Sequence, residues 1–397
     1  MIVNASRIIH LNPTAAFMAN MILEEKTEKE SIRAITNKFQ ISREQAINDF
    51  KHLKVQIDEL TRPDGACPIH EMEVDIVPPF STHPSAPYRM DLAITYHCNN
   101  DCSHCYNDRP RDYPELPTEQ WKKIIEKLWH IGIPHIVFTG GEPTLREDLP
   151  ELIHHAQNIG QITGLNTNGR RLNNINYLNQ LVEAGLDHVQ ITIESHDPAI
   201  HDQMVNTKGA WAQTSDGIKN AIDSPLFVMT NTTLLTKNTP FIRDTLEFLE
   251  KMGVPTIGLN ALIYAGRGLS VGSGLNESEL APLIEMARRK TQNSGQRLIW
   301  YTPTQYCNFD PMSLELGIKG CTAALYNMCI EPNGSVIPCQ SYYHSLGNLL
   351  IDDWDSIWNH DLAISLRERR NIPGKCKGCI LINECGGGCP LFNQINC

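Results

Sequence analysis

The sequence contains no uninterrupted apolar run of about 20 residues, the length needed to cross a bilayer. Its first residues also lack the basic start, apolar run and small-residue cleavage site of a secretory signal peptide. Positive charge is in deficit, because 34 Lys and Arg stand against 45 Asp and Glu and give a formal net charge of −11. These absences predict a cytoplasmic protein without a membrane segment. They argue against a general nucleic-acid binder, which needs basic surface to neutralise phosphates.

Cysteine, by contrast, is abundant and unevenly spread. Of 13 cysteines, one is at position 67, three lie between 98 and 105, and nine lie between 307 and 397. In a reducing cytoplasm such groups are more often metal ligands than disulfides, and an odd total fits disulfide pairing poorly. A chain of 397 residues is also expected to hold two or three domains.

The first cysteine group is a Cys-x3-Cys-x2-Cys run formed by Cys98, Cys102 and Cys105, with no fourth cysteine nearby. A four-iron cluster held by three thiolates keeps one iron open, and an open iron can bind a small molecule. Zinc is the alternative, because structural zinc takes four closed ligands. His97 or His104 could complete such a site on sequence grounds.

A second motif follows further along the chain, where an apolar run ends in Gly140-Gly141-Glu142-Pro143. This pattern predicts a buried strand that runs into a tight turn with backbone exposed for a ligand. The cysteine run and this turn, in this order and spacing, together resemble the radical S-adenosylmethionine (SAM) superfamily. The resemblance implies that the three cysteines hold a [4Fe-4S] cluster, that SAM chelates its open iron, and that the turn contacts the methionine amino group.

Residues 90–300 alternate between strand-like and helix-like runs. Strand-like runs cover 92–95, 135–139, 161–167, 188–194, 226–234 and 256–262, and helical runs begin at 117 and cover 148–159, 175–184, 211–222, 239–252 and 277–291. Repeated βα units imply a parallel sheet with right-handed crossovers, and six strands suit an α/β fold of the partial (β/α)6 TIM-like barrel type. Sites in such folds lie at the carboxyl ends of the strands, where both motifs fall.

Polar residues at further strand ends are candidates for SAM contacts. By resemblance, Asn168, Thr192 and Glu194 would contact the ribose and carboxylate, and His104 would lie near the adenine. The fourth strand end departs from the family's usual Ser and Asp followed by Gly, and Val205 stands where a related segment normally has Arg. Ordinary strand-end hydrogen bonding is the alternative role for these residues. No side chain is singled out as a catalytic acid or base.

The sequence pattern of residues 1–62 predicts a small separate domain. The many prolines of residues 63–89 predict a linker. A short strand, a helix start at Asn12 or Thr14, and capping signals at 27–30 and 42–45 predict a winged-helix-like module of one strand and three helices. The third helix is not basic, which disfavours DNA binding. The stretch "LNPTAAFM" and the following helices resemble the peptide-recognition domain typified by the pyrroloquinoline quinone chaperone. That resemblance implies binding of a precursor peptide's leader as an added strand.

The C-terminal part, 301–397, carries a second cysteine pattern. Its spacing resembles the SPASM extension of radical SAM enzymes, which implies two auxiliary iron–sulfur clusters. By resemblance, the outer cluster would be bound by Cys376, Cys379, Cys385 and Cys397. The inner cluster would be bound by Cys321, Cys339 and Cys389. A single zinc site is the alternative for Cys376, Cys379, Cys385 and Cys389.

The fourth ligand of the inner cluster stays open between two cysteines. Cys307 precedes Cys321 and Cys329 follows it. Residues 330–337 predict a hairpin with Asn-Gly at its turn, which would bring Cys339 back beside Cys329 and favours Cys329 over Cys307. Without a fourth thiolate the inner cluster would keep an open iron for a substrate atom, whereas full ligation would favour electron transfer.

Together the resemblances imply a radical SAM/SPASM peptide maturase. Reductive cleavage of SAM would give a 5′-deoxyadenosyl radical that takes hydrogen from a ribosomally made precursor peptide. The product would be an oxidative modification such as a thioether or carbon–carbon crosslink. The partners would be the peptide and an electron donor such as flavodoxin or ferredoxin. Haem-tailoring relatives share the SPASM architecture, so tetrapyrrole side-chain modification is the alternative. An iron–sulfur or zinc scaffold with a regulatory helix-turn-helix is the non-enzyme alternative.

Overall fold

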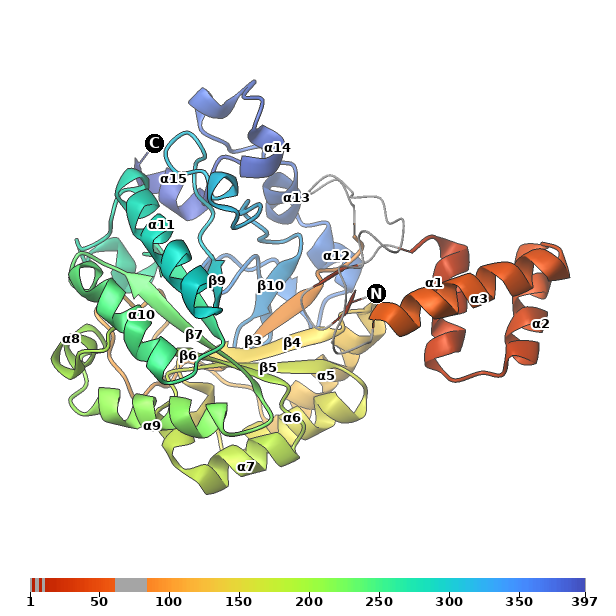
Figure 1. The fold of residues 1–397 in the computed structure, drawn as a ribbon, viewed down its shortest axis with the longest axis horizontal. Helices are drawn as coiled ribbons and strands as arrows, with labels where there is room; N and C mark the ends of the chain where they lie inside the picture. Colours follow the sequence, from red (N-terminus) through yellow and green to blue (C-terminus); the bar gives the residue numbers. More distant parts are fainter. Residues whose placement is uncertain (1, 4–6, 9–10, 61–83, 397) are drawn as a thin grey trace. The chain divides into compact units, whose positions relative to one another are not determined.

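The computed structural model describes residues 2–3, 7–8, 11–60 and 84–396. The chain divides into two compact units, Met1–Pro78 and Pro79–Cys397, which Figure 1 shows in colours that follow the sequence. Most of the expected linker 63–89, and the expected ligand Cys397, lie outside the described residues. Among the described residues, no helix is long and apolar enough to cross a membrane.

The first unit consists of two short strands and three helices. Strands β1 (Ile2–Val3) and β2 (Arg7–Ile8) pair antiparallel, and helices α1 (Pro13–Leu23), α2 (Glu28–Phe39) and α3 (Arg43–Leu60) follow. The side chain of Asn12 accepts a hydrogen bond from the Ala15 amide at 2.8 Å and so caps α1. Thr27 and Glu30 form the predicted capping box of α2. Apolar side chains of the three helices meet in one small core. The three helices were predicted, whereas β1 was not.

A ten-stranded sheet is the frame of the second unit, in the order β12-β11-β10-β3-β4-β5-β6-β7-β8-β9. Its first six strands in the chain are β3 (Arg89–Thr95), β4 (His135–Gly140), β5 (Ile162–Thr167), β6 (His188–Thr192), β7 (Phe227–Leu234) and β8 (Thr256–Ala261). These are the six predicted strands, and each pairs parallel with the next. The α/β class and the partial TIM-like barrel are therefore confirmed. Strand β9 (Arg297–Trp300), which pairs parallel with β8, was not predicted.

Helices follow the strands and surround the sheet in Figure 1. The longer helices are α5 (Thr118–Ile131), α6 (Leu149–Asn158), α7 (Ile175–Glu183), α9 (Ala210–Ile222), α10 (Ile242–Lys251) and α11 (Glu277–Ser294). The shorter ones are α8 (Pro198–Met204) and the 3₁₀ turns η1 (Pro143–Leu145), η2 (Arg170–Asn173), η3 (Thr239–Phe241) and η4 (Gly266–Leu269). Strand β3 shows how the layers form, because Met90, Leu92 and Ile94 alternate along it and share one core with the helices. Its opposite face carries Asp91 and Ala93.

The C-terminal segment joins the same sheet. Strand β10 (Asn327–Ile330) pairs parallel with β3, and β11 (Ser335–Ile337) and β12 (Gly347–Asn348) continue the sheet antiparallel. The predicted hairpin is therefore present as β10 and β11. The remaining turns and helices are η5 (Met312–Leu314), α12 (Trp354–Trp358), α13 (Asp361–Arg367), η6 (Gly374–Cys376), α14 (Ile382–Cys385) and α15 (Pro390–Asn396). Because β10 bonds to β3, the sheet ties the cysteine-rich part to the strand that precedes the first cysteine run.

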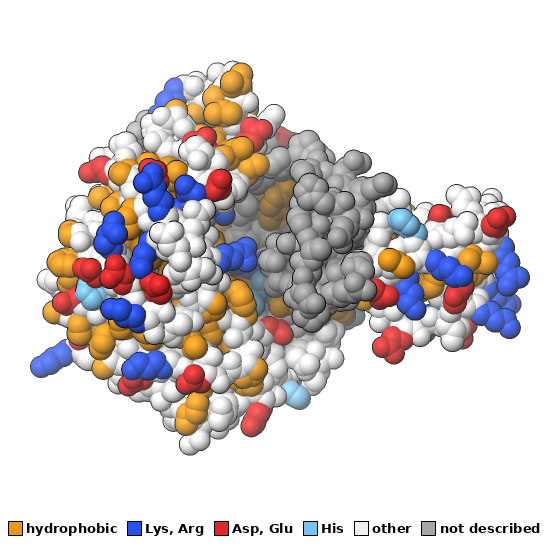
Figure 2. Space-filling model, viewed as in Figure 1, with side chains coloured by type: hydrophobic (Ala, Val, Ile, Leu, Met, Phe, Trp, Pro, Cys, Tyr) orange, Lys and Arg blue, Asp and Glu red, His pale blue; other side chains and the backbone are white. Residues whose placement is uncertain are grey.

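The surface over α10 and α11 carries charges of both signs. In Figure 2 the Lys and Arg side chains on this face are interspersed with Asp and Glu rather than gathered into one basic stripe. Two ion pairs account for part of this pattern: Arg289 with Glu285, and Lys290 with Glu250 at 2.5 Å. A phosphate backbone would meet compensated charge on this face.

Candidate functional site

The first cysteine run lies in the loop that follows β3. Its backbone rests on the end of α8, where the Asp101 and Ser103 amides donate to the carbonyl oxygens of Val205 and Met204 at 2.9 and 3.0 Å. Cys98, Cys102 and Cys105 are all half-buried. The segment around Val205, which lacks the Arg expected by resemblance, therefore supports the loop through its backbone.

Three arginines hold the same loop: Arg111, which follows it closely in the chain, and Arg170 and Arg267, which come from distant parts. Arg111 donates to the carbonyl oxygen of Cys98, and Arg170 of η2 donates to the side-chain oxygen of Asn100 at 2.8 Å. The Arg267 amide of η4 donates to the carbonyl oxygen of Cys105 at 2.9 Å. A guanidinium group offers several donors in a rigid plane, so it can hold loop carbonyls that have no partner in regular secondary structure. The loop is thus fixed at both ends and in its middle.

The Gly-Gly-Glu-Pro turn lies directly against the end of β3. The Gly141 amide donates to Thr95 O and the Glu142 amide to His97 O, both at 2.8 Å. A Cβ atom on Gly140 would lie 2.0 Å from Thr95 O, and one on Gly141 would lie 2.4 Å from His97 O. Gly140 also has a φ of +131°, which L-residues rarely adopt. Only glycine allows the turn to approach the cysteine loop this closely.

The carboxylate of Glu142 is fully buried and already has four donors. One oxygen accepts from the Thr144 amide and hydroxyl at 3.1 and 2.5 Å and from the Thr167 hydroxyl at 2.7 Å. The other accepts from the Asn168 amide at 2.8 Å. Burial raises the pKa of Glu142, and these hydrogen bonds oppose the rise. Glu142 therefore connects the turn after β4 to the end of β5.

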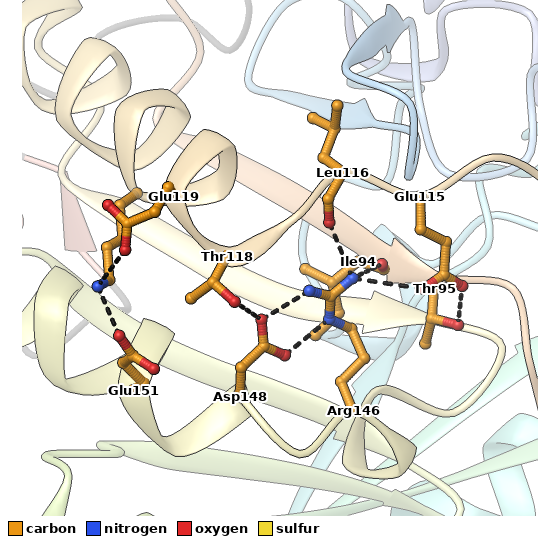
Figure 3. A network of polar contacts seen from close by, with 10 residues as sticks. Ile94, Thr95, Glu115, Leu116, Thr118, Glu119, Arg146, Asp148 and Glu151 are labelled. Atoms are coloured by element: carbon orange, nitrogen blue, oxygen red, sulfur yellow. Dashed lines mark hydrogen bonds and ion pairs between the residues drawn. The ribbon is translucent and has the colours of Figure 1, made fainter.

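Arg146, three residues beyond Pro143, fixes the turn to the end of β3 (Figure 3). It donates to the carbonyl oxygens of Ile94 and Leu116, both at 3.2 Å, and pairs with Asp148 at 2.6 Å. Burial raises the pKa of Asp148, but the hydrogen bonds from Arg146 and Thr118 outweigh it and hold this pKa below its usual value. Figure 3 shows the guanidinium group between these partners. The ends of β3 and β4 are thus held together by one side chain.

His104 and Glu194 form a second buried connection across the site. The His104 Nε2 and Glu194 Oε1 atoms are 3.0 Å apart, and the other Glu194 oxygen accepts from the Thr233 amide of β7 at 3.0 Å. The Nδ1 atom of His104 is buried and has no hydrogen-bond partner among the described residues. The cysteine loop is therefore joined to the ends of β6 and β7, and one ring nitrogen stays available for a ligand.

The two other predicted SAM contacts lie at the ends of neighbouring strands. Asn168 follows β5 and donates from its side chain to the Asn99 side chain at 2.6 Å, within the cysteine loop. Thr192 ends β6 beside Asn231 of β7 and is half-buried. The structure thus places the predicted residues of this group at one edge of the sheet.

Two of the three thiols of this loop, Cys98 and Cys102, lie in a poorly compensated electrostatic environment. The pKa of Cys98 is raised to about 11, by burial first and then by Glu142 and Cys105. Burial, Cys105, Glu194 and Cys98 raise the pKa of Cys102 further. Thiolates at this position need added positive charge, and bound metal would supply it.

The structure also brings together three cysteines of the inner set. Burial and then the thiols of Cys389 and Cys339 raise the pKa of Cys321. Burial raises the pKa of Cys339 to about 12, with a contribution from Cys389. Cys329 lies in β10 opposite Asp91 and Ile337 and is fully buried. Cys339 is among the groups that raise the pKa of Cys329, so the hairpin does bring the two cysteines near each other.

The outer set gathers around Cys376. Burial raises the pKa of Cys376, and the thiols of Cys385, Cys307 and Cys379 raise it further. In the described part of the chain no three His, Cys, Asp or Glu side chains lie close enough to hold a single metal ion. The thiols come together more loosely, as sets whose members shift one another's pKa.

Sequence reasoning missed two features of the site. Arg111 and Arg170 were not predicted, although Arg170 directly follows the Asn166–Gly169 strand end that supplied the candidate Asn168. The second feature is a buried group beside β10, where Arg109 pairs with Glu331 at 2.7 Å and the Tyr96 hydroxyl donates to Glu331 at 3.2 Å. These contacts join residues more than 220 positions apart, which no local pattern reveals.

Comparison with known families agrees with this fold. Residues 92–260 match the family model described as the radical SAM superfamily. The fold and this match thus define a radical SAM enzyme. Residues 321–380 match the SPASM model, described as an iron–sulfur cluster-binding domain. The chain is therefore a radical SAM enzyme with a C-terminal SPASM domain.

Curated relatives of two kinds are similar to this chain. An AdoMet-dependent heme synthase from Oleidesulfovibrio alaskensis is 27% identical over 74% of this chain and 80% of its own length. A PqqA peptide cyclase from Bradyrhizobium diazoefficiens is 29% identical over 70% of this chain and 72% of its own. The structure of Streptococcus suis SuiB bound to precursor peptide SuiA superposes with a TM-score of 0.68 at 16% identity, over 98% of this chain and 91% of SuiB. The last comparison bears on the fold alone.

Proposed function

We propose that Cys98, Cys102 and Cys105 hold a [4Fe-4S] cluster whose open iron binds SAM. The donor set fits this group, because buried Glu142 and Glu194 help to raise the pKa values of Cys98 and Cys102, and thiolates there call for positive charge. When bound, the cluster and SAM would supply the radical chemistry.

The protein's own residues would position SAM at the edge of the sheet. Both carboxylate oxygens of Glu142 already accept hydrogen bonds within the protein. We therefore assign contact with the methionine amino group to the backbone of Gly140, Gly141 and Pro143. Asn168, Thr192 and Glu194 would contact the ribose and carboxylate, as the resemblance implies.

His104 is assigned the place beside the adenine. Its ring is held by Glu194 on one side, and its buried Nδ1 atom has no partner among the described residues. A buried ring nitrogen without a hydrogen-bond partner costs free energy, and a ligand that forms a hydrogen bond with it removes that cost. An adenine offers both donor and acceptor groups.

The SPASM domain would hold two auxiliary clusters. Cys321, Cys339 and Cys389 are assigned to the inner one, with Cys329 as the additional thiol beside Cys339. Cys376, Cys379 and Cys385 are assigned to the outer one, and the further expected ligand, Cys397, lies outside the described residues. These clusters would accept the electron released by an oxidised substrate, and flavodoxin or ferredoxin would deliver the electron that starts the reaction.

The substrate we propose is a ribosomally made precursor peptide. The observation that carries this proposal is the N-terminal unit, with two short strands and three helices. The likeness to SuiB bound to its precursor peptide extends over 98% of this chain. A two-stranded sheet leaves backbone donors and acceptors at its edges for a leader strand. The reaction would be an oxidative modification such as a thioether or carbon–carbon crosslink.

The test is to incubate the anaerobically reconstituted full chain with SAM, dithionite and the short peptide encoded nearest its gene. We expect 5′-deoxyadenosine and a peptide that is lighter by two hydrogens in the mass spectrum. Cys102→Ala should abolish both products yet still bind the isolated N-terminal half of the peptide in a fluorescence polarisation assay. Deoxyadenosine without peptide modification, and no peptide binding, would refute the substrate assignment.

Tetrapyrrole modification is the second candidate. Two curated relatives favour it, the heme synthase described above and an Fe-coproporphyrin III synthase from Methanosarcina barkeri, 28% identical over 74% of this chain and 81% of its own length. Incubation with iron coproporphyrin III under the same conditions distinguishes the two. Conversion of the porphyrin without any modification of the peptide would establish this second function.

A further inference from the structure

We propose that His201 is a positioning residue of the SAM site, which fixes the buried residue Glu194 and, through Glu194, the ring of His104. The inference rests on the proposed function, in which Glu194 and His104 contact SAM. His201 lies in the short helix α8, beyond the strand ends that supplied the predicted SAM contacts.

The ring of His201 contacts the protein through one acceptor nitrogen. His201 is only 1% exposed, and its Nδ1 atom accepts a hydrogen bond from the Glu194 amide at 3.1 Å. An amide can donate only to a ring nitrogen that carries no proton, so the proton of the neutral ring is on Nε2. Burial lowers the pKa of His201 and favours this neutral ring. Because Nε2 has no hydrogen-bond partner among the described residues, the polar contact that the ring makes there is the one through Nδ1.

This contact holds the backbone at the point where strand β6 ends. The Ile193 amide still donates to a carbonyl oxygen of β7 at 3.0 Å, but the next amide, that of Glu194, donates to His201. The carbonyl oxygen of Glu194 accepts from the Asn238 side chain at 2.8 Å. Two side chains from outside the sheet therefore fix the backbone of Glu194 on both sides.

The position of the Glu194 carboxylate depends on this backbone. Glu194 is 1% exposed, one of its oxygens lies 3.0 Å from His104 Nε2, and the other accepts from the Thr233 amide at 3.0 Å. Without an acceptor at His201, the Glu194 amide would be a buried donor without a partner, and the backbone would have to move to satisfy it. Such a movement would displace the carboxylate and the His104 ring together, and small displacements of binding groups weaken binding.

The backbone of α8 gives His201 a second connection to the site. The carbonyl oxygens of Met204 and Val205 accept from two amides of the cysteine loop at 3.0 and 2.9 Å, and the Val205 amide donates to His201 O at 3.0 Å. His201 therefore lies one helical turn before the residues that support the loop. Its ring holds the end of β6 while its helix holds the cysteine loop.

The experiment compares three substitutions of His201 in the full chain. The side-chain oxygen of asparagine is as many bonds from Cα as Nδ1 is, so His201→Asn keeps an acceptor for the Glu194 amide. Glutamine places its polar atoms where Nε2 lies, and leucine has none, so His201→Gln and His201→Leu both lose that acceptor. The matched control is His360→Gln, because His360 Nδ1 likewise accepts a backbone amide, that of Leu362 in α13 at 3.2 Å.

The measurements are SAM affinity, by isothermal titration to the anaerobically reconstituted protein, and thermal unfolding by circular dichroism. We expect His201→Gln and His201→Leu to bind SAM about tenfold more weakly than the parent, and His201→Asn to stay within about threefold of it. His360→Gln should lower the melting temperature and leave SAM affinity unchanged. In a Glu194→Gln background, His201→Gln should change the affinity by less than about twofold, because its effect passes through the Glu194 carboxylate.

Two results would overturn the role of His201. One is parent-like SAM affinity in whichever of His201→Gln and His201→Leu folds. The other is a loss in His201→Asn as large as in those variants, or a full tenfold loss in the Glu194→Gln background, since either would show that the effect does not pass from Nδ1 through Glu194. A parent protein that binds no SAM would instead refute the proposed function.

Discussion

Replacing Gly140 by alanine tests whether the Gly-Gly-Glu-Pro turn needs its close approach to β3. The added Cβ would lie 2.0 Å from Thr95 O, whereas ordinary contact begins near about 3.5 Å. The opposing atom belongs to the backbone of a central strand and cannot rotate away. The turn must therefore move, and the hydrogen bond from the Gly141 amide to Thr95 O is weakened.

The expected loss of stability has two parts. Alanine at a φ of +131° costs about 1–3 kcal/mol in backbone strain. The forced shift and the weakened hydrogen bond add about 2–4 kcal/mol. Gly132 provides the matched control, because its φ is also positive, at +96°, but a Cβ there meets nothing within 4 Å. Gly132→Ala should cost only the strain, about 1–3 kcal/mol.

The assays are thermal unfolding followed by circular dichroism, and SAM binding by isothermal titration to the anaerobically reconstituted protein. At about 2 °C or more per kcal/mol, Gly140→Ala should melt roughly 6–14 °C below the parent and Gly132→Ala roughly 2–6 °C below it. Gly140→Ala should also weaken SAM binding by about tenfold or more, as expected for about 1.4 kcal/mol of lost contacts, and Gly132→Ala should leave it unchanged. Equal melting temperatures and equal SAM affinities for the two variants would refute the reasoning.

Three further predictions concern buried polar groups. The pKa of His135 is lowered to about 3, and that of His188 to about 4, chiefly by burial. As the pH falls, the two histidines therefore take up protons in the unfolded chain before they do so in the folded protein. We expect the free energy of unfolding to have its full value above about pH 6.5 and to fall towards pH 4, by up to about 1.4 kcal/mol per pH unit for each histidine. A flatter profile for His135→Gln in urea unfolding would support this, and an unchanged slope would contradict it. Glu142→Gln should lower the free energy of unfolding in urea by about 1–3 kcal/mol, because an amide nitrogen cannot accept the hydrogen bonds of the carboxylate oxygen it replaces. An unchanged free energy of unfolding would show that the four donors find other partners. Arg109→Met should destabilise the protein by about 2–4 kcal/mol by leaving Glu331 buried without its partner, and the double variant with Glu331→Gln should recover part of that loss in thermal unfolding.

Local patterns predicted much of the fold. The capping box at Thr27 and the cap at Asn12 need only neighbours within three residues, so their signal is complete in the sequence. The six strands β3 to β8 were found because βα repetition and apolar runs are also local. Strand β9, a short edge strand, was not found, and neither was the pairing of β10 with β3, because β3 lies far earlier in the chain than β10.

The sequence by itself was enough to predict the chemistry of the site. Two motifs are local: the spacing of Cys98, Cys102 and Cys105, and the Gly-Gly-Glu-Pro turn. Each depends only on the order of residues within a short stretch of chain, so the sequence alone reveals it. The number and spacing of the cysteines in the tail likewise indicate iron–sulfur ligation from residue order alone.

Only the tertiary structure decided how these groups are held and which of them meet. Arg111, Arg170 and Arg267 reach one loop from three places, and Glu142 uses its carboxylate inside the protein. Glu277 of α11 and Asn393 of α15 both hold Gln305, which lies two residues before Cys307. Such meetings depend on how distant segments pack against one another, and packing is a property of the whole chain rather than of any interval along it.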